Sequence, residues 1–285
     1  MPALLALLAS ALWGTGDFVG GLLSRRISSL AVVFLGMCVA LVAVCALAVV
    51  VRPPLGADVL CGAAAGVAGG VALVCFYRAM AAGPMSVVAP LSATGTVIPV
   101  LWDVARGAPV DLLQLAGMLL AFAGVVLAGG PEWRRSPGTA RSTLLLTMAA
   151  AAGFGLYFIF VAQGAQTSVL GTLLGQRAAG ALLLGPAAVR GWRSGTSMLS
   201  GLRDHLSVKL LIALMLGGLA DVTANGIYGV ATALPRANLA VVTVLASLYP
   251  VMTTVLARGL LKERLRVVQN VGVLAALAGV LLLNT

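Results

Sequence analysis

The chain has 285 residues, of which 61% are hydrophobic and only 9% are charged, and its mean hydropathy is +1.09. Soluble domains carry about 25% charged residues, so this composition excludes a soluble protein and indicates one solvated mostly by lipid. The net charge of +10 does not indicate nucleic-acid binding, because the basic residues lie in short connections between apolar segments and no nucleic-acid module is recognisable.

A helix needs about 20 apolar residues to cross the hydrocarbon core of a bilayer. Ten such segments follow one another, separated by short connections that carry Gly, Pro and charged residues. They are predicted at residues 3–23, 30–51, 58–80, 84–103, 112–130, 143–164, 168–189, 207–232, 236–257 and 267–284. No connection is long enough for a separate soluble domain, so the sequence predicts an all-α, multi-pass integral membrane protein.

The two halves of the chain resemble each other. When residues 77–104 are displaced by 151 positions without gaps, 7 of 28 positions are identical, including a tyrosine and two prolines. The tyrosine and proline pairs are Tyr77 with Tyr228, Pro84 with Pro235 and Pro99 with Pro250, and separately Ala11-Leu12-Trp13-Gly14 aligns with Ala152-Gly153-Phe154-Gly155. We therefore predict a first repeat over residues 1–130, a connecting loop over 131–141 and a second repeat over 142–285. Because five helices is an odd number, the repeats are predicted to be inverted relative to each other, as in many secondary transporters.

Charged groups within predicted spans are costly in hydrocarbon and are therefore functional candidates. Asp221 lies near the middle of its span, and Asn225 and Tyr228 follow at i+4 and i+7 on the same helical face. Arg177 lies near the middle of the preceding span. Two interpretations are open for Asp221 and Arg177: a structural ion pair between their helices, or a role in substrate binding or proton coupling.

Asp17 is the third candidate, one turn beyond Trp13 in the first span. It takes part in binding or coupling, or else it reaches the membrane interface or pairs with Arg25 or Arg26. Asp103 is predicted to be interfacial. The aromatic residues are predicted either to line a central cavity, where rings stack on an amphiphilic substrate or attract a cation, or to serve helix packing. These residues are Trp13, Phe154, Tyr157, Tyr228 and Tyr249.

Proline and glycine residues mark special positions within the spans. Pro99 and Pro250 occupy equivalent positions in the two repeats, and Pro90 shares its span with Pro99. Each proline removes a backbone donor and loosens one turn of its helix. Pro99 and Pro250 are therefore predicted to be hinges, with a tolerated kink as the alternative. The runs Gly62-xxx-Gly66-xxx-Gly70 and Gly16-xxx-Gly20 are predicted to be close-packing faces within the chain, with dimerisation as the alternative. A monomer and a homodimer are both compatible with the sequence.

Several motifs together resemble a known family. They are Ala11-Leu12-Trp13-Gly14, Tyr77-Arg78-Ala79-Met80, Val88-Ala89-Pro90-Leu91, Pro99-Val100, Tyr249-Pro250-Val251 and Leu260-Leu261-Lys262-Glu263-Arg264-Leu265, with Gln269 and Gly272. Over nearly its whole length the chain is similar to the drug/metabolite transporter superfamily, in its ten-helix EamA-type branch. The resemblance implies a transporter, most often an exporter of amino acids, nucleobases or other metabolites. The chain departs from the family's Gly-Glu pair, because Lys262 replaces the glycine before Glu263 and the first repeat has Gly107-Ala108 without a glutamate.

The leading hypothesis is a secondary active transporter of a small metabolite in the cytoplasmic membrane, working by alternating access and coupled to protons through Asp221 or Asp17. Its expected partners are this substrate and the bilayer. A lipid-linked carrier flippase is a variant of the same hypothesis, and a non-transporting partner subunit or a channel is a third class. Energy from ATP is not expected, since neither Lys209 nor Lys262 lies in a phosphate-binding glycine-rich loop. No cofactor is predicted.

An intramembrane enzyme is not expected. The only histidine, His205, lies in a predicted loop, and no Ser-His pair or paired aspartates are visible. The four cysteines have no metal-ligand spacing, so no metal site is predicted.

The orientation in the membrane is open. Fourteen of the 18 Lys and Arg residues lie in or beside connections 1/2, 3/4, 5/6, 7/8 and 9/10, three lie in the other four connections, and Arg177 lies within a span. The positive-inside rule then places both termini outside the cell, whereas the family resemblance implies that both are cytoplasmic.

Overall fold

A computed structural model describes residues 1–53, 55–83, 85–107, 111–129, 137–193, 207–235, 237–261 and 267–283. Its helices are α1 (Pro2–Ser24), α2 (Ser29–Val51), α3 (Ala57–Ala82), α4 (Met85–Ser92), the 3₁₀ helix η1 (Ala93–Thr96), α5 (Val97–Ala105), α6 (Leu112–Gly129), α7 (Pro137–Ala165), α8 (Val169–Arg193), α10 (Val208–Ala233), α11 (Leu239–Ala246), α12 (Tyr249–Leu261) and α13 (Val267–Leu283). Residues 131–136 of the predicted connecting loop, His205, and Lys262 with Glu263 lie outside the described residues.

These segments correspond to the ten predicted spans, but two spans are not the continuous helices that we predicted. The fourth is broken into α4, η1 and α5, and the ninth into α11 and α12. The prolines explain where the second segments begin, because Pro99 lies in the first turn of α5 and Pro250 in the first turn of α12. The N–H groups of a first turn have no hydrogen-bond partner within the helix, so a proline costs no helical hydrogen bond there. The sixth helix begins at Pro137, earlier than the predicted residue 143, because proline is also favourable in a first turn.

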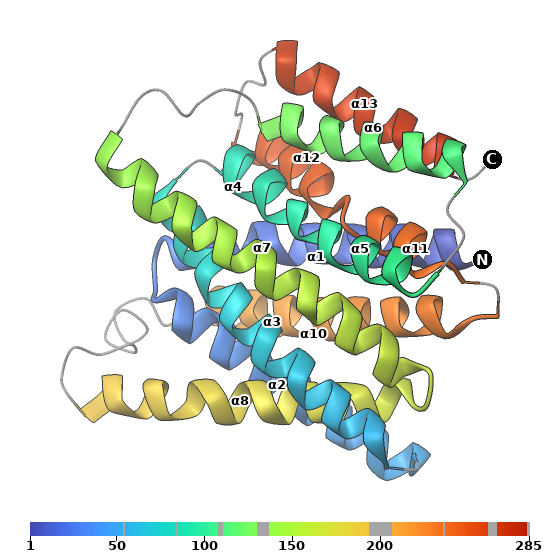
Figure 1. The fold of residues 1–285 in the computed structure, drawn as a ribbon. Coiled ribbons are helices and arrows are strands. Elements are labelled where there is room, and N and C mark those ends of the chain that lie inside the picture. The colour runs from blue at the N-terminus through green and yellow to red at the C-terminus, as the bar shows by residue number, and fades with distance from the viewer. Residues whose placement is uncertain are drawn as a thin grey trace.

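The two repeats pack through their third helices. Helix α3 of the first repeat packs on α7 and α8, the first two helices of the second repeat. Helix α10 of the second repeat packs on α1 and α2, the corresponding helices of the first. Helices α6 and α13, which end the two repeats, lie side by side at one edge of the molecule (Figure 1). This reciprocal packing gives an all-helical fold of two inverted five-helix repeats.

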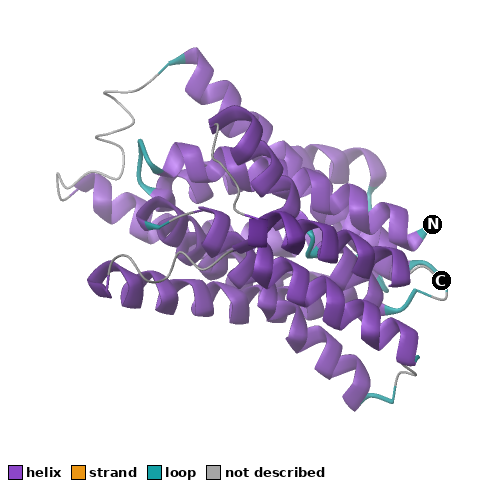
Figure 2. Ribbon diagram, turned by 90° about the horizontal axis from the view of Figure 1, so that it is seen from above, coloured by secondary structure: helices purple, strands orange, loops and turns teal. Residues whose placement is uncertain are grey.

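The surface of the bundle is apolar. Large side chains such as Leu60, Leu119 and Leu182 are 74%, 61% and 76% exposed, which in a soluble protein would be an aggregation liability. Five described helices, α1, α2, α3, α7 over Ser142–Ala165 and α10, are long and apolar enough to cross a membrane, and shorter apolar helices accompany them. Helices fill the view from above (Figure 2). Lipid tails solvate an apolar surface of this kind, and several helices are long enough to cross a bilayer. The protein is therefore a multi-pass membrane protein.

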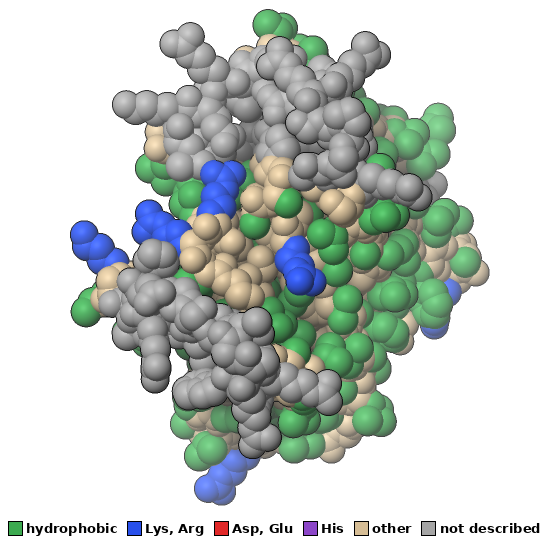
Figure 3. Space-filling view, turned by 90° about the vertical axis from the view of Figure 1, so that its left-hand side faces the viewer, with side chains coloured by type: hydrophobic (Ala, Val, Ile, Leu, Met, Phe, Trp, Pro, Cys, Tyr) green, Lys and Arg blue, Asp and Glu red, His purple; other side chains and the backbone are tan. Residues whose placement is uncertain are grey.

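Basic side chains gather at one end of the bundle. Both chain termini lie at the other end, whereas α1 ends and α2 begins at the basic end (Figure 1). Viewed from this end, the described side chains include Lys and Arg but no visible Asp or Glu (Figure 3). We call these two ends of the molecule the basic end and the terminal end.

Candidate functional site

Glycines in α3 bring Arg177 into the centre of the bundle. A Cβ atom on Gly62 or Gly66 would collide with the backbone carbonyl of Thr172 or Gln176 in α8. The two helices therefore touch backbone to backbone, as small residues allow in membrane proteins. This confirms the Gly62-xxx-Gly66 run as a packing face within the chain, and it fixes the depth at which α8 presents Gln176 and Arg177.

Arg177 and Asp221 form an ion pair between α8 and α10, in which the arginine is buried and the aspartate is partly buried. The Nη1 atom of Arg177 lies 2.6 Å from Oδ2 of Asp221, and the Arg177 side chain is 2% exposed against 27% for Asp221. Asn225, one turn along α10, donates from Nδ2 to the same Oδ2 atom at 3.5 Å. The predicted structural ion pair is thus present, but its members also line a cavity.

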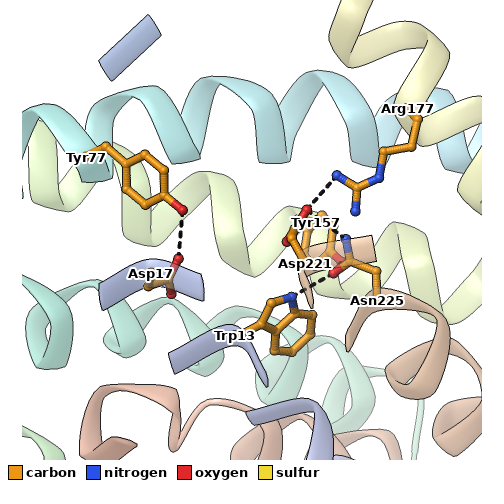
Figure 4. Close-up of polar contacts among 7 residues, drawn as sticks. All are labelled: Trp13, Asp17, Tyr77, Tyr157, Arg177, Asp221 and Asn225. Carbon is orange, nitrogen blue, oxygen red and sulfur yellow. Dashed lines mark hydrogen bonds and ion pairs between the residues drawn. The ribbon is translucent and has the colours of Figure 1, made fainter. Parts of the chain in front are cut away.

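Two aromatic side chains orient the Asn225 amide (Figure 4). Trp13 of α1 donates from Nε1 to Oδ1 of Asn225 at 2.8 Å, and the Tyr157 hydroxyl of α7 donates to the same oxygen at 2.6 Å. With its oxygen accepting from both donors, the amide turns its nitrogen toward Asp221. One polar network therefore joins α1 of the first repeat to α7, α8 and α10 of the second.

Asp17 lies apart from this network and has a different partner. Its Oδ1 atom accepts a hydrogen bond from the Tyr77 hydroxyl of α3 at 3.2 Å, and Asp17 is only 9% exposed. The Tyr77 ring lies over Gly20, where a Cβ would approach ring carbon Cζ to 2.5 Å, so the glycine makes room for this contact. Asp17 does not pair with Arg25 or Arg26, which are exposed at the basic end.

Two small cavities meet at these residues. The central cavity, of about 50 Å³, has room for a few water molecules. It is lined from both repeats, by Trp13, Asp17, Met37, Gly66, Tyr157, Gln176, Arg177, Asp221, Asn225 and Tyr249 among others. The side cavity, of about 40 Å³, shares Trp13, Asp17 and Asp221 and continues between α1, α2 and α10 to Leu23 and Val32, toward the basic end.

Aromatic rings close the site on the other side. Trp13 packs against Phe158 and Tyr228 with ring centroids 5.7 Å away in both cases, and Phe158 lies 5.2 Å from Tyr228. Trp13 precedes Asp17 in α1, and Tyr228 follows Asp221 and Asn225 in α10, so these rings lie on the terminal side of the charged residues. We call Trp13, Phe158 and Tyr228 the aromatic plug.

The structure thus brings most of the predicted site residues together. Trp13, Asp17, Tyr157, Arg177, Asp221, Asn225 and Tyr249 all line the central cavity. Tyr228 does not line either cavity, because its hydroxyl, 2.8 Å from Oγ1 of Thr243 and 3.4 Å from the Phe158 carbonyl, lies behind the Trp13 ring.

Sequence reasoning missed Tyr77 as a site residue. Its equivalence to Tyr228 in the repeat alignment was a usable signal, because a repeated tyrosine in a membrane helix needs a hydroxyl partner in each copy. It also missed Ser92, whose hydroxyl lies 2.7 Å from that of Tyr249. A serine among apolar residues carries no comparable signal.

The site brings together groups that can bind a polar molecule. Among the described residues no group of three or more His, Cys, Asp or Glu could hold a metal ion. A guanidinium, two carboxylates and an amide instead line one cavity between the two inverted repeats, which is walled by aromatic rings. Such a site can recognise a polar molecule while remaining shielded from lipid.

Comparisons with known proteins agree with this fold. A solved structure described only as "Crystal structure of protein" superposes with a TM-score of 0.69 over 99% of this chain and 95% of that one, at 17% sequence identity. That likeness shows the fold alone. No functionally curated protein matches the sequence. The EamA-like transporter family matches residues 1–130 and 141–285, which is nearly the whole chain in two parts. The chain belongs to the EamA-like transporter family.

Proposed function

We propose that this protein is a secondary active transporter that moves a small polar metabolite across the cytoplasmic membrane by alternating access. The observation that carries the proposal is the set of three charged residues, the buried Asp17 and Arg177 and the partly buried Asp221, in a cavity lined by both repeats. Charges at this depth are costly, and a purely structural role would not require a cavity around them.

The two carboxylates have different roles in this proposal. Asp221 is neutralised by Arg177 at 2.6 Å, so its charge is balanced inside the protein. Asp17 is paired with no cation among the described residues and accepts one hydrogen bond, from Tyr77. Of the two residues predicted for proton coupling, Asp17 is therefore the better candidate, because a proton or a cationic group of the substrate can balance its charge.

The two sides of the site support alternating access. The aromatic plug closes the central cavity toward the terminal end, and the side cavity extends from Asp17 and Asp221 toward the basic end. Neither cavity, at about 50 and 40 Å³, accommodates a metabolite in this closed arrangement. The repeats must therefore move relative to each other during transport, opening the side cavity in one state and parting the plug in the other.

The test is transport by the purified protein in liposomes that contain a fluorescent pH indicator. We expect amino acids, nucleobases or other metabolites to drive proton movement in the wild type, and Asp17→Asn to abolish that proton movement while the substrate still binds. A thermal-stability screen of the same compounds in detergent measures binding separately, since a ligand at 100 times its Kd adds about 2.7 kcal/mol.

Asp111→Asn is the matched control, because Asp111 is an exposed aspartate at the start of α6 and its variant should retain wild-type coupling. Full proton coupling in Asp17→Asn would remove Asp17 from the mechanism. Absence of both binding and transport for every compound would contradict the proposed function itself.

A further inference from the structure

Equivalent hydroxyl groups in the two repeats have different partners. At the offset of 151 residues, Tyr77 corresponds to Tyr228 and Ser92 to Thr243. In the second repeat the two hydroxyl groups contact each other, because the oxygens of Tyr228 and Thr243 lie 2.8 Å apart. In the first repeat both hydroxyl groups are present, but each has another partner. One contact is therefore made in one repeat and left unmade in the other.

The partners in the first repeat hold the two hydroxyl groups separately. Tyr77 donates to Oδ1 of Asp17 at 3.2 Å. Ser92 donates to the Ala89 carbonyl at 2.8 Å, so in its contact of 2.7 Å with Tyr249 the Tyr249 hydroxyl is the donor. Because a hydroxyl oxygen has two acceptor lone pairs, Ser92 is able to accept one more hydrogen bond.

The residue at one aligned position explains why the repeats differ. In the alignment of the first helices of the two repeats, Asp17 corresponds to Phe158. At this position Tyr228 meets a neutral backbone carbonyl, at 3.4 Å, whereas Tyr77 meets a carboxylate. A hydrogen bond to an ionised group is about twice as strong as one between neutral groups. The charge of Asp17 therefore holds Tyr77 away from Ser92.

The two arrangements lie toward opposite ends of the molecule. Tyr228 belongs to the aromatic plug, which closes the site toward the terminal end. Tyr77 and Asp17 line the side cavity, which extends toward the basic end. When inverted repeats alternate access, the closed end and the open end exchange. Closing the basic end thus requires the first repeat to make the contact that the second repeat already makes.

The packing around Tyr77 permits this exchange. The Phe76 ring lies 5.8 Å from the Tyr77 ring and 6.3 Å from the Tyr249 ring, between centroids, so one ring separates Tyr77 from the partner of Ser92. Helix α3, which carries Tyr77, also packs on α4, which carries Ser92. Tyr77 borders the side cavity and lies over Gly20, which has no side chain to obstruct its ring.

Asp17 is the group whose charge controls the exchange. The ionisable groups that share its two cavities on the helices packed against α1 are Tyr77 of α3, Asp221 of α10 and Tyr249 of α12, and Arg177 of α8 lies across the central cavity. Helices α2 and α11, which also pack on α1, contribute no ionisable side chain to either cavity. Arg177 is paired with Asp221, and Asp17 contacts Tyr77 apart from that pair (Figure 4).

We propose that Tyr77 is a switch that closes the basic end. When a proton or a cationic group neutralises Asp17, the Tyr77 hydroxyl leaves Asp17 and donates to Ser92, which makes the counterpart of the contact between Tyr228 and Thr243. The inference rests on the proposed function and identifies Tyr77 and Ser92 as positioning residues of the transport cycle. Neutralisation of Asp17 and closure of the basic end then occur together.

The test measures the distance between α3 and α10 at the basic end, where α3 ends and α10 begins (Figure 1). Spin labels are attached to Arg78→Cys and Lys209→Cys, at two exposed positions, after the four native cysteines are replaced by alanine. Asp17→Asn supplies a neutral side chain, and the distance is measured by double electron–electron resonance at one fixed pH. We expect the population with the shorter distance to rise by about twofold or more, because a neutral amide holds Tyr77 less strongly.

Ser92→Ala is the decisive variant, because it removes the acceptor that Tyr77 needs. Added to Asp17→Asn, it should abolish the change in distance, and Tyr77→Phe should do the same. Ser92→Thr, which introduces the residue type of the equivalent position in the second repeat, should retain the change. Thr96→Ala is the matched control and should also retain it, since the Thr96 hydroxyl donates to the Ala93 carbonyl within its own 3₁₀ helix.

Each other outcome overturns the inference. An unchanged or longer distance in both Asp17→Asn and Asp17→Leu, of which the second offers no acceptor at all, would show that Asp17 does not control the basic end. A change that persists with Ser92→Ala or Tyr77→Phe would show that Tyr77 does not move to Ser92. A change lost equally with Thr96→Ala would indicate a general loosening of the broken span. The measurement uses no substrate, so failure of the liposome assay contradicts the proposed function separately.

Discussion

Helices α3 and α10 are equivalent members of the two repeats, yet they carry different chemistry. At the offset of 151 residues, Gly66 corresponds to Gly217 and Gly70 to Asp221. A Cβ on Gly66 would collide with the backbone of α8, whereas a Cβ on Gly217 would meet nothing within 4 Å. The first repeat therefore closes its side of the site, and the second leaves the space that the side cavity occupies.

The tyrosines of the same two helices extend the comparison. Tyr77 donates to the carboxylate of Asp17, and Tyr228 lies 3.4 Å from the backbone carbonyl of Phe158. In the alignment that pairs Trp13 with Phe154, Phe158 stands at the position of Asp17. In both repeats the tyrosine hydroxyl therefore contacts the residue at the same aligned position, through the Asp17 side chain in the first repeat and through the Phe158 backbone in the second.

The largest effect on stability is expected at Gly66 of α3. Gly66→Leu forces α3 and α8 apart, and because the collision is with backbone it should destabilise the protein by about 3 kcal/mol or prevent folding. Gly217→Leu, at the equivalent position of α10, should stay within about 1 kcal/mol of the wild type and fill part of the side cavity. The measurement is SDS titration of unfolding in mixed micelles, and equal destabilisation by the two variants would contradict the asymmetry of the repeats.

The next largest effect on stability is expected at Asp221, whose equivalent position in the first repeat is Gly70. Asp221→Asn leaves Arg177 buried without its counter-charge, which should cost about 3 kcal/mol and abolish transport. Adding Arg177→Gln should restore most of the stability but not the transport, since the pair is then neutral. If the double variant is no more stable than Asp221→Asn in the same titration, the two side chains are not energetically coupled.

A smaller effect distinguishes the two tyrosines. Tyr77→Phe removes a hydrogen bond to a carboxylate and should cost about 2 kcal/mol, whereas Tyr228→Phe removes one to neutral groups and should cost about 1 kcal/mol. Only Tyr77→Phe is expected to change the pH dependence of transport, because only Tyr77 contacts Asp17. A similar change in Tyr228→Phe would indicate that the aromatic plug, rather than Asp17, sets that dependence.

Much of the fold was predictable from the sequence because hydrocarbon imposes length and polarity on each span. Ten apolar segments and an odd number per half are enough to predict inverted repeats, and charges such as Arg177 and Asp221 are visible as exceptions to the apolar pattern. The glycine run at Gly62 and Gly66 likewise predicted a packing face, which the backbone contacts with α8 confirm.

The details of the site were less predictable, because they depend on which helices meet. The sequence places Asn225 and Tyr228 on one face of α10, but only the fold turns Asn225 toward Trp13 and Tyr157 and puts Tyr228 behind the Trp13 ring. The prolines predicted a hinge or a kink in the fourth and ninth spans, but not their division into separate helical segments. An apolar run with prolines fits a kinked helix as well as two helical segments, so the choice depends on packing around the run.

The smallest effect is expected where the two repeats are most alike. Pro99 and Pro250 lie in the first turns of the second segments of the broken spans. The two breaks face a common cavity of about 210 Å³ lined by Thr96, Ser247 and Leu248 among others. Because they lie in a first turn, these prolines remove no helical hydrogen bond, so Pro99→Ala and Pro250→Ala should each change stability by less than about 1 kcal/mol.

If the breaks are hinges, both variants should slow transport by a similar factor of about three, because alanine permits the two segments to join into one stiffer helix. Pro186→Ala, within the continuous helix α8, is the control and should leave the transport rate unchanged. A slower rate in only one of the two hinge variants would mean that the repeats have diverged in motion as well as in charge, and wild-type rates in both would show that the breaks are static.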